Sequence, residues 1–244
     1  MKNKFIIVIP ARYNSKRLPG KPLIKILGIP MIIRTYNQCL KVADKNHIFV
    51  ASDDNRILKL CDDYGIKNVL TSKKCLTGTD RVAEVAKKIH AKVYINVQGD
   101  EPICDVGDIK KLIKYALKYP HQIINGYTEI KDKKLFLSGN IPKVVFRNDG
   151  RLLYQSRAGI PTTKKLQFKK AWRQVCIYSL PNKVLKIFRN KGKKTTLEKL
   201  EDCELVRFLE LGLEVKMIKM SDNSISVDTR DDLRKIVKVL KKKR

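Results

Sequence analysis

The first half of the chain alternates short apolar runs with segments of helical spacing. The apolar runs have few charges, as is typical of parallel strands buried on both faces of a sheet, and cover residues 4–10, 47–52, 66–70 and 92–100. Amphipathic helical spacing follows each run, at residues 30–43, 53–65, 78–90 and 105–119. This order predicts right-handed crossovers and an α/β fold with a doubly wound, mostly parallel Rossmann-like sheet.

The regular alternation ends near Pro120. Strand-like segments of mixed direction follow, and residues 147–151 (RNDGR) between them predict a hairpin turn. A continuous helix is expected over 196–212, then a strand over 213–220 and a final helix over 229–243. The pattern predicts one domain over 1–244, made of a first half (1–121), an inserted β-rich lobe (122–212) and a returning strand and helix (213–244).

Composition supports a folded chain with a full apolar core, because 43% of the 244 residues are hydrophobic. No apolar run approaches the roughly 18–20 residues of a membrane span. The first run is short and basic residues follow it at once, which is unlike a signal peptide. The six cysteines are spread singly, which indicates free thiols in a reducing compartment. We therefore expect a cytoplasmic protein.

The charge balance raises a different possibility, since 53 basic against 24 acidic residues give a formal net charge of +29. Such a charge can indicate a nucleic acid or another polyanion as partner. The lysines are scattered over every predicted helix, however, and aromatic residues make up only 7% of the chain. A lysine-biased composition is the favoured explanation, nucleic acid is not the expected partner, and polyanion binding remains the alternative of a different class. A small anionic substrate would also suit this field.

The most informative loop follows the first strand, where ligands of open α/β sheets bind. Residues 10–23 (PARYNSKRLPGKPL) bring Arg12, Arg17 and Lys21 together with Gly20, which allows close backbone approach. Such a loop can wrap a triphosphate and neutralise charge on a leaving pyrophosphate. An ordinary surface loop is the alternative. The loop matches neither GxxxxGKS/T nor GxGxxG, which disfavours kinases, GTPases and dinucleotide-binding enzymes.

Carboxylates follow a second strand and precede the last helix. Residues 96–102 (NVQGDEP) place Asp100 and Glu101 at a strand end, where hard oxygen ligands can hold a phosphate-bridging Mg²⁺. A polar turn closed by Pro102 is the alternative. Asp228 alone is typical of a helix cap, but together with Asp100 it could complete a metal site.

Five segments in this order resemble the 3-deoxy-manno-octulosonate cytidylyltransferase (CMP-Kdo synthetase) family. They are RYNSKRLPGKPL (12–23), TGTDRVAEV (77–85), NVQGDEP (96–102), TLEKLEDCELVRFL (196–209) and SVDTRDDL (226–233). The resemblance covers nearly the whole chain. It implies a nucleotidyltransferase that uses Mg²⁺ to transfer CMP from CTP to the anomeric hydroxyl of 3-deoxy-D-manno-octulosonate (Kdo), giving CMP-Kdo and pyrophosphate for lipopolysaccharide or capsule biosynthesis. It also implies a homodimer, with the β-rich lobe and residues 197–211 as interface.

The resemblance assigns roles to individual residues. CTP would contact Pro10, Ala11, Arg12, Arg17, Lys21, Gly78, Thr79, Arg81 and Gln98. The Mg²⁺ carboxylates would be Asp100 and Asp228, which form the catalytic set together with Arg17 and Lys21. The sugar acid would draw on Ser156, Arg157, Gln174, Tyr178 and Glu201. No general base is evident, and the three histidines are interpreted as structural.

The departures from the family concentrate on the sugar side. Cys75 and Leu76 stand where family members carry His and Gln, and Gln174 stands where they carry His. Residues 160–165 read IPTTKK instead of IPW followed by acidic residues. Cytidylyl transfer is therefore a firmer expectation than Kdo as acceptor. An 8-amino-Kdo analogue or a nonulosonic acid stays open as the acceptor, as does another sugar nucleotidyltransferase activity.

Overall fold

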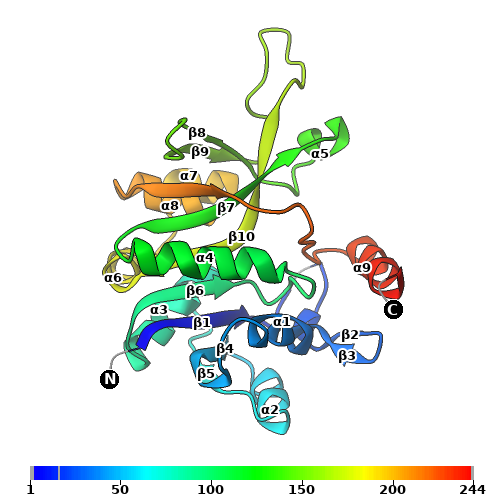
Figure 1. Ribbon diagram of the computed structural model, residues 1–244, viewed down its shortest axis with the longest axis vertical. Helices are drawn as coiled ribbons and strands as arrows, with labels where there is room; N and C mark the ends of the chain where they lie inside the picture. Colours follow the sequence, from blue (N-terminus) through cyan, green and yellow to red (C-terminus); the bar gives the residue numbers. More distant parts are fainter. Residues whose placement is uncertain (1–2, 16, 243–244) are drawn as a thin grey trace.

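One twisted sheet runs through the protein (Figure 1). The computed structural model describes residues 3–15 and 17–242, so Lys16 and the last residue of the expected final helix lie outside the described residues. The strands are β1 (Asn3–Ala11), β2 (Lys25–Ile26), β3 (Ile29–Pro30), β4 (Ile48–Ser52), β5 (Asn68–Leu70), β6 (Ala91–Val97), β7 (Ile123–Ile130), β8 (Lys143–Phe146), β9 (Leu152–Ser156), β10 (Ala171–Pro181) and β11 (Val215–Lys219). Along the main sheet their order is β11–β7–β10–β6–β1–β4–β5.

The α-helices cover both faces of this sheet. They are α1 (Met31–Leu40), α2 (Asn55–Asp63), α3 (Gly78–Lys88), α4 (Val106–Lys118), α5 (Lys133–Leu137), α6 (Asn182–Asn190), α7 (Thr196–Glu201), α8 (Glu204–Glu210) and α9 (Arg230–Lys242). Short 3₁₀ turns occur at Lys21–Leu23 and Lys45–His47. No helix within the described ranges is long and apolar enough to cross a membrane.

The predicted parallel core of the sheet is confirmed. β1 pairs in parallel with both β4 and β6, and β11 pairs in parallel with β7, whereas β10 runs antiparallel between β6 and β7. The sheet is therefore continuous across the expected boundary between residues 121 and 122. The β8–β9 hairpin extends from it through β10, and the amide of Arg147 donates to the carbonyl of Arg151 at 2.8 Å, as the expected turn requires.

Burial on both faces explains the continuous apolar runs. Ile7 and Ile9 of β1 face one core, which α1, α2 and α4 cover, while Ile6 and Val8 face the other, which α3, α6 and α8 cover. A third, smaller cluster packs Ile236 of α9 against the first loop and its surroundings. The last helix is thereby fixed beside the carboxyl ends of the central strands.

The continuous helix expected over 196–212 is wrong. α7 ends at Glu201, Asp202 adopts a left-handed conformation with φ of 48°, and α8 begins at Glu204. The break is stabilised from a distant part of the chain, because the Arg157 guanidinium donates to the carbonyls of Glu201 (2.8 Å) and Asp202 (2.9 Å). The sequence pattern also did not predict α5 and α6.

A buried ion network joins α7 and α8 to the start of α3. Arg207 is fully buried and donates to both carboxylate oxygens of Glu198, at 2.6 and 2.7 Å, and to Asp80 at 2.7 Å. Asp80 also accepts from the amide of Thr77, which caps α3. The guanidinium lies 3.9 Å from the ring centroid of Phe188. One cation thus holds α7 and α8 to the start of α3, which lies far from both in sequence.

Replacing Arg207 with Met should destabilise the protein by about 3–5 kcal/mol, because Glu198 would remain buried without its cation. Urea unfolding followed by circular dichroism measures this loss. Arg234→Met is the matched control, since Arg234 forms an exposed pair with Asp231, and it should change stability by less than about 0.5 kcal/mol. Equal effects of the two substitutions would contradict a structural role for the buried network.

Candidate functional site

A cleft of about 780 Å³ opens at the carboxyl ends of β1 and β6. This is where an open α/β sheet binds its ligands, and the volume suits a nucleotide-sized molecule. Most of the sequence-predicted residues line it: Pro10, Ala11, Arg12, Arg17, Lys21, Gly78, Arg81, Gln98, Asp100, Arg157 and Asp228. Segments from the first loop, α3, the β6 end and the α9 entrance therefore meet as expected.

Hydrogen bonds to the backbone of Tyr13 hold the first loop in its conformation. Its carbonyl accepts from the amides of Ser15 (2.9 Å) and Gly20 (3.0 Å), and Gly20 has φ of 66°, a left-handed conformation that favours glycine. The Arg56 guanidinium lies 3.3 Å from the centroid of the Tyr13 ring and also pairs with Asp54. Sequence reasoning missed Arg56, because no local pattern in α2 points to a ring in another loop.

Lys21 lies at the electrostatic centre of the cleft. Its Nζ donates to Asp100 Oδ2 (2.6 Å), to the carbonyl of Val227 (2.8 Å) and to Asp228 Oδ1 (3.2 Å). Arg17 pairs with the same Asp228 oxygen at 3.1 Å. Two carboxylates from distant parts of the chain therefore converge on two cations of the first loop.

Two carboxylates are too few for a complete protein metal site. The described residues contain no group of three or more His, Cys, Asp or Glu side chains that could hold a metal ion. Mg²⁺, however, is commonly held by one or two carboxylates together with substrate phosphates and water. Asp100 and Asp228 both reach the same nitrogen and face the cleft, so their arrangement fits a Mg²⁺ that arrives with a phosphate ligand.

Glu101, the other candidate ligand, is only 3% exposed, and its Oε2 has no hydrogen-bond partner in the part of the chain described. Burial, and secondly the charge of Asp100, raises the pKa of Glu101 to about 8. Its side chain lies outside the cleft lining, unlike that of Asp100.

The start of α3 forms another wall of the cleft. Glu204 of α8 accepts from the amides of Gly78 (3.0 Å) and Thr79 (3.1 Å) and from the Thr79 hydroxyl. Thr79 is fully buried behind this wall, whereas Arg81 reaches the cleft and pairs with Asp53 at 3.4 Å. Burial raises the pKa of Glu204. Sequence reasoning favoured Glu201 in this segment and missed Glu204, because a continuous helix gives the wrong face.

Of the expected sugar-side residues, Arg157 lines the cleft. Ser156 donates to Glu201 at 2.7 Å, and Glu201 also accepts from the Arg157 amide at 2.8 Å, so these two residues support Arg157 from behind. Gln174 donates to the Tyr178 hydroxyl at 2.9 Å within a buried amide cluster. Asn140, Lys194, Glu198, Asp202 and Glu204 also line the cleft and were not predicted there.

Lys143 is a buried lysine next to the backbone of Arg157. It is fully buried on β8 and donates to the carbonyls of Ser138 (2.9 Å) and Arg157 (2.5 Å). Burial, and secondly the charge of Arg157, lowers the pKa of Lys143. Its position inside an otherwise apolar strand is the only sequence signal that could have found it. Lys143 fixes the backbone from which Arg157 and the loop before β8 enter the cleft.

Of the residues that depart from the family, two lie here, whereas Gln174 and residues 160–165 are not among the lining residues. Cys75 and Leu76 line the cleft beside the start of α3. Burial raises the pKa of the Cys75 thiol to about 12, so it is not a thiolate nucleophile at neutral pH. None of the three histidines, all of which belong to the described part of the chain, lines the cleft.

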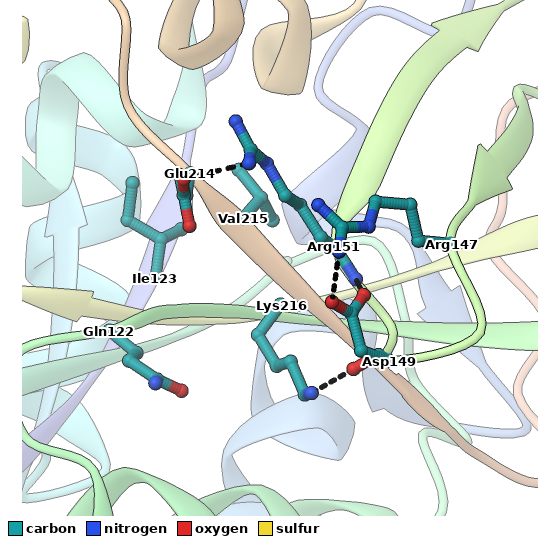
Figure 2. A pocket seen from close by; sticks show the side chains of 8 residues that line it. All are labelled: Gln122, Ile123, Arg147, Asp149, Arg151, Glu214, Val215 and Lys216. Carbon is teal, nitrogen blue, oxygen red and sulfur yellow. Dashed lines mark hydrogen bonds and ion pairs between the residues drawn. The ribbon is translucent and has the colours of Figure 1, made fainter.

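A second cavity, of about 220 Å³, lies at the amino ends of β7 and β11 (Figure 2). Its charged side chains pair with one another: Arg147 with Asp149 at 3.0 Å, and Arg151 with Glu214 at 3.1 Å. Lys216 donates to the carbonyl of Asp149. These contacts hold the hairpin turn against β11, and the cations of this cavity already have partners within the protein. The larger cleft is therefore the better candidate for binding an anion.

Comparison with known proteins agrees with this geometry. The cytidylyltransferase family profile matches residues 6–219. The chain is 36% identical to a 3-deoxy-manno-octulosonate cytidylyltransferase from Chloroherpeton thalassium, over 98% of this chain and 99% of that one. It is 34% identical to the mitochondrial 3-deoxy-manno-octulosonate cytidylyltransferase of Arabidopsis thaliana, over 99% of this chain and 85% of that one.

A solved structure of CMP:2-keto-3-deoxy-manno-octonic acid synthetase complexed with CTP superimposes with a TM-score of 0.90. It shares 32% identity, and the match covers 99% of this chain and 100% of that one. The fold expected from the sequence is therefore confirmed, and so is the family resemblance.

Lys143 should make the free energy of unfolding depend on pH. Since its pKa is lower in the folded protein than the ordinary 10.5, the unfolded chain binds more protons between those two values, and stability rises with pH in that window. The stability of the wild type relative to Lys143→Met should therefore increase as pH rises from 7 towards 10.5, measured by urea unfolding. Lys111→Met, at an exposed lysine that donates to the carbonyl of Lys219, is the control. The prediction would be refuted if the free energy of unfolding of the wild type, relative to that of Lys143→Met, stays constant or decreases over this range.

Proposed function

The chain belongs to the cytidylyltransferase family, and from this premise we propose that it transfers CMP from CTP to the anomeric hydroxyl of Kdo, giving CMP-Kdo and pyrophosphate. The observation that carries the proposal is the convergence of Arg17 and Lys21 with Asp100 and Asp228 at one end of the cleft. In this reaction the acceptor hydroxyl attacks the α-phosphorus, and the bond to the pyrophosphate oxygen breaks. The product serves lipopolysaccharide or capsule biosynthesis, and the free thiols support a cytoplasmic location.

The nucleotide occupies the side of the cleft formed by the first loop and α3. Arg12, Arg17 and Lys21 bind the triphosphate and stabilise charge on the leaving pyrophosphate. Pro10, Ala11 and Gln98 contact the ribose and base, beside Gly78 of α3, where a Cβ would come within 2.9 Å of the Gln98 side chain. Arg81 adds positive charge, and Thr79 acts indirectly by fixing Glu204.

The carboxylates supply a site for Mg²⁺. Asp100 and Asp228 would hold the ion, which when bound lowers the pKa of the attacking hydroxyl and neutralises phosphate charge.

The sugar acid occupies the opposite side, where Arg157 binds its carboxylate. Ser156 and Glu201 hold the backbone of Arg157, while Gln174 and Tyr178 belong to a buried polar cluster outside the cleft lining. Because Gln174 of this cluster differs from the family pattern, as do Cys75 and Leu76 beside the start of α3, an 8-amino-Kdo analogue or a nonulosonic acid is the second candidate acceptor.

The direct test measures pyrophosphate release with CTP, Mg²⁺ and each of three acids: Kdo, its 8-amino analogue and N-acetylneuraminate. Release with Kdo should fall at least about 100-fold in Asp100→Asn, because the variant loses one carboxylate at the reacting phosphate. Asp222→Asn, at an exposed carboxylate paired with Lys131, should leave the rate unchanged.

The remaining outcomes separate the alternatives. Release only with another acid would replace Kdo as the acceptor, and release with UTP or GTP would indicate a different nucleotidyltransferase. Silence with every acid, from folded protein that binds RNA with steep salt dependence, would favour the polyanion-binding alternative.

We also propose a homodimer, formed through the β-rich lobe and α7. Leu200 and Leu197 of α7 are 76% and 40% exposed, and Leu153 of β9 is 56% exposed. β9 and α7 are joined by a hydrogen bond from the Tyr154 hydroxyl to Glu201 at 3.3 Å. Such exposed apolar side chains are typical of a protein interface.

Leu200→Lys should shift the protein from dimer to monomer in sedimentation velocity, because a dimer interface would have to bury the added charge. Leu40→Lys, at a 45% exposed leucine at the end of α1, is the control and should remain dimeric. A wild type that sediments as a monomer at micromolar concentrations would refute the dimer.

A further inference from the structure

We propose that Lys21 acts as an internal cation that occupies the carboxylate site of the free enzyme. It keeps a divalent cation from Asp100 and Asp228 until the phosphates of a nucleotide draw the ammonium away. The inference rests on the proposed function in one respect, namely that these two carboxylates are the metal ligands. It goes beyond that function by giving Lys21 a role before the nucleotide binds.

The contacts of Lys21 are those of a bound cation. An ammonium has three N–H donors, and all three are satisfied, by Asp100 Oδ2, Asp228 Oδ1 and the carbonyl of Val227. Carboxylate and carbonyl oxygens are also the ligands that divalent cations of this class prefer. The Lys21 side chain is only 11% exposed, so it lies within the site.

The backbone segments that carry these oxygens are joined by hydrogen bonds that do not involve Lys21. Val227 is fully buried, and its amide donates to the carbonyl of Asp100 at 2.9 Å. The amides of Asp228 and Thr229 donate to Asp232 at 3.2 and 3.0 Å. The Val227 carbonyl and the backbone that carries the two carboxylates therefore stay in place without Lys21, whereas the four-carbon stem of Lys21 can move.

Charge makes the two occupants mutually exclusive. A divalent cation beside the Lys21 ammonium and the Arg17 guanidinium would bring four positive charges against two carboxylates. Triphosphate oxygens provide an alternative partner for both Lys21 and Arg17 on the same face of the cleft. Nucleotide binding and divalent cation binding are then positively coupled, with Lys21 as the coupling group.

The test is the binding of Mn²⁺ alone, measured by electron paramagnetic resonance without nucleotide or acceptor. Lys21→Met should bind one Mn²⁺ at least about tenfold more tightly than the wild type, because the ammonium no longer competes. Adding Asp100→Asn to Lys21→Met should abolish the gain. Lys21→Arg, which keeps the charge, should bind as weakly as the wild type.

Lys131→Met is the matched control for the loss of one positive charge from a strongly basic protein. Lys131 pairs with the single carboxylate of Asp222 at 2.8 Å, so its removal frees one carboxylate instead of two, and Mn²⁺ affinity should not change. An equal gain in Lys131→Met, or no gain in Lys21→Met, would overturn the proposal. Lys21→Gln provides a second neutral side chain if the Met variant fails to fold, as judged by circular dichroism.

This measurement is independent of catalysis. If pyrophosphate release is absent with every acid but Lys21→Met gains Mn²⁺ affinity, the proposed function fails and the role of Lys21 stands. If release is observed but Lys21→Met binds Mn²⁺ no more tightly than the wild type, the function stands and the role of Lys21 fails.

Discussion

Two carboxylates at the same edge of a sheet repel each other unless a positive charge lies between them. Asp100 follows β6 and Asp228 precedes α9, and Lys21 of the first loop provides that charge. This need for a positive charge also determines where several segments of the chain lie. It brings the first loop, the β6 end and the α9 entrance to one point, and Ile236 of α9 packs on the opposite side of the same segments. The architecture of the cleft depends on this convergence.

The sequence predicted those parts of the site that depend on strand order alone. Lys21 and Asp100 follow apolar runs, and parallel strands end at one edge, so their proximity needed no further information. The insertion of β10 between β6 and β7 was not predictable, because alternation in a strand does not specify its partner. Nor was the break at Asp202, which depends on Arg157, 45 residues earlier in the chain. Glu204 and Arg56 were missed for the same reason, since their partners belong to distant elements.

Arg207 and Lys143 are both buried cations near the cleft, but they bind different groups and have different structural roles. Arg207 pairs with the carboxylates of Asp80 and Glu198 and thereby joins α3, α7 and α8. Lys143 instead donates to backbone carbonyls, which places a strand relative to two loops without neutralising any acid. An apolar side chain would fill either position but would leave those oxygens without donors. The polar framework therefore specifies the positions of the cleft walls, while the apolar clusters supply most of the stability.

The same comparison separates structural cations from exchangeable ones. Arg207 is fully buried and satisfied by carboxylates, so a ligand cannot compete for it. Arg17 is half exposed, with an amide oxygen and one partly exposed carboxylate as partners, and phosphate oxygens can replace both. A net charge of +29 by itself distinguishes neither group. Selectivity for a small, highly charged anion follows instead from concentrating exchangeable cations in one cleft, where weak internal partners hold them in place until the ligand binds.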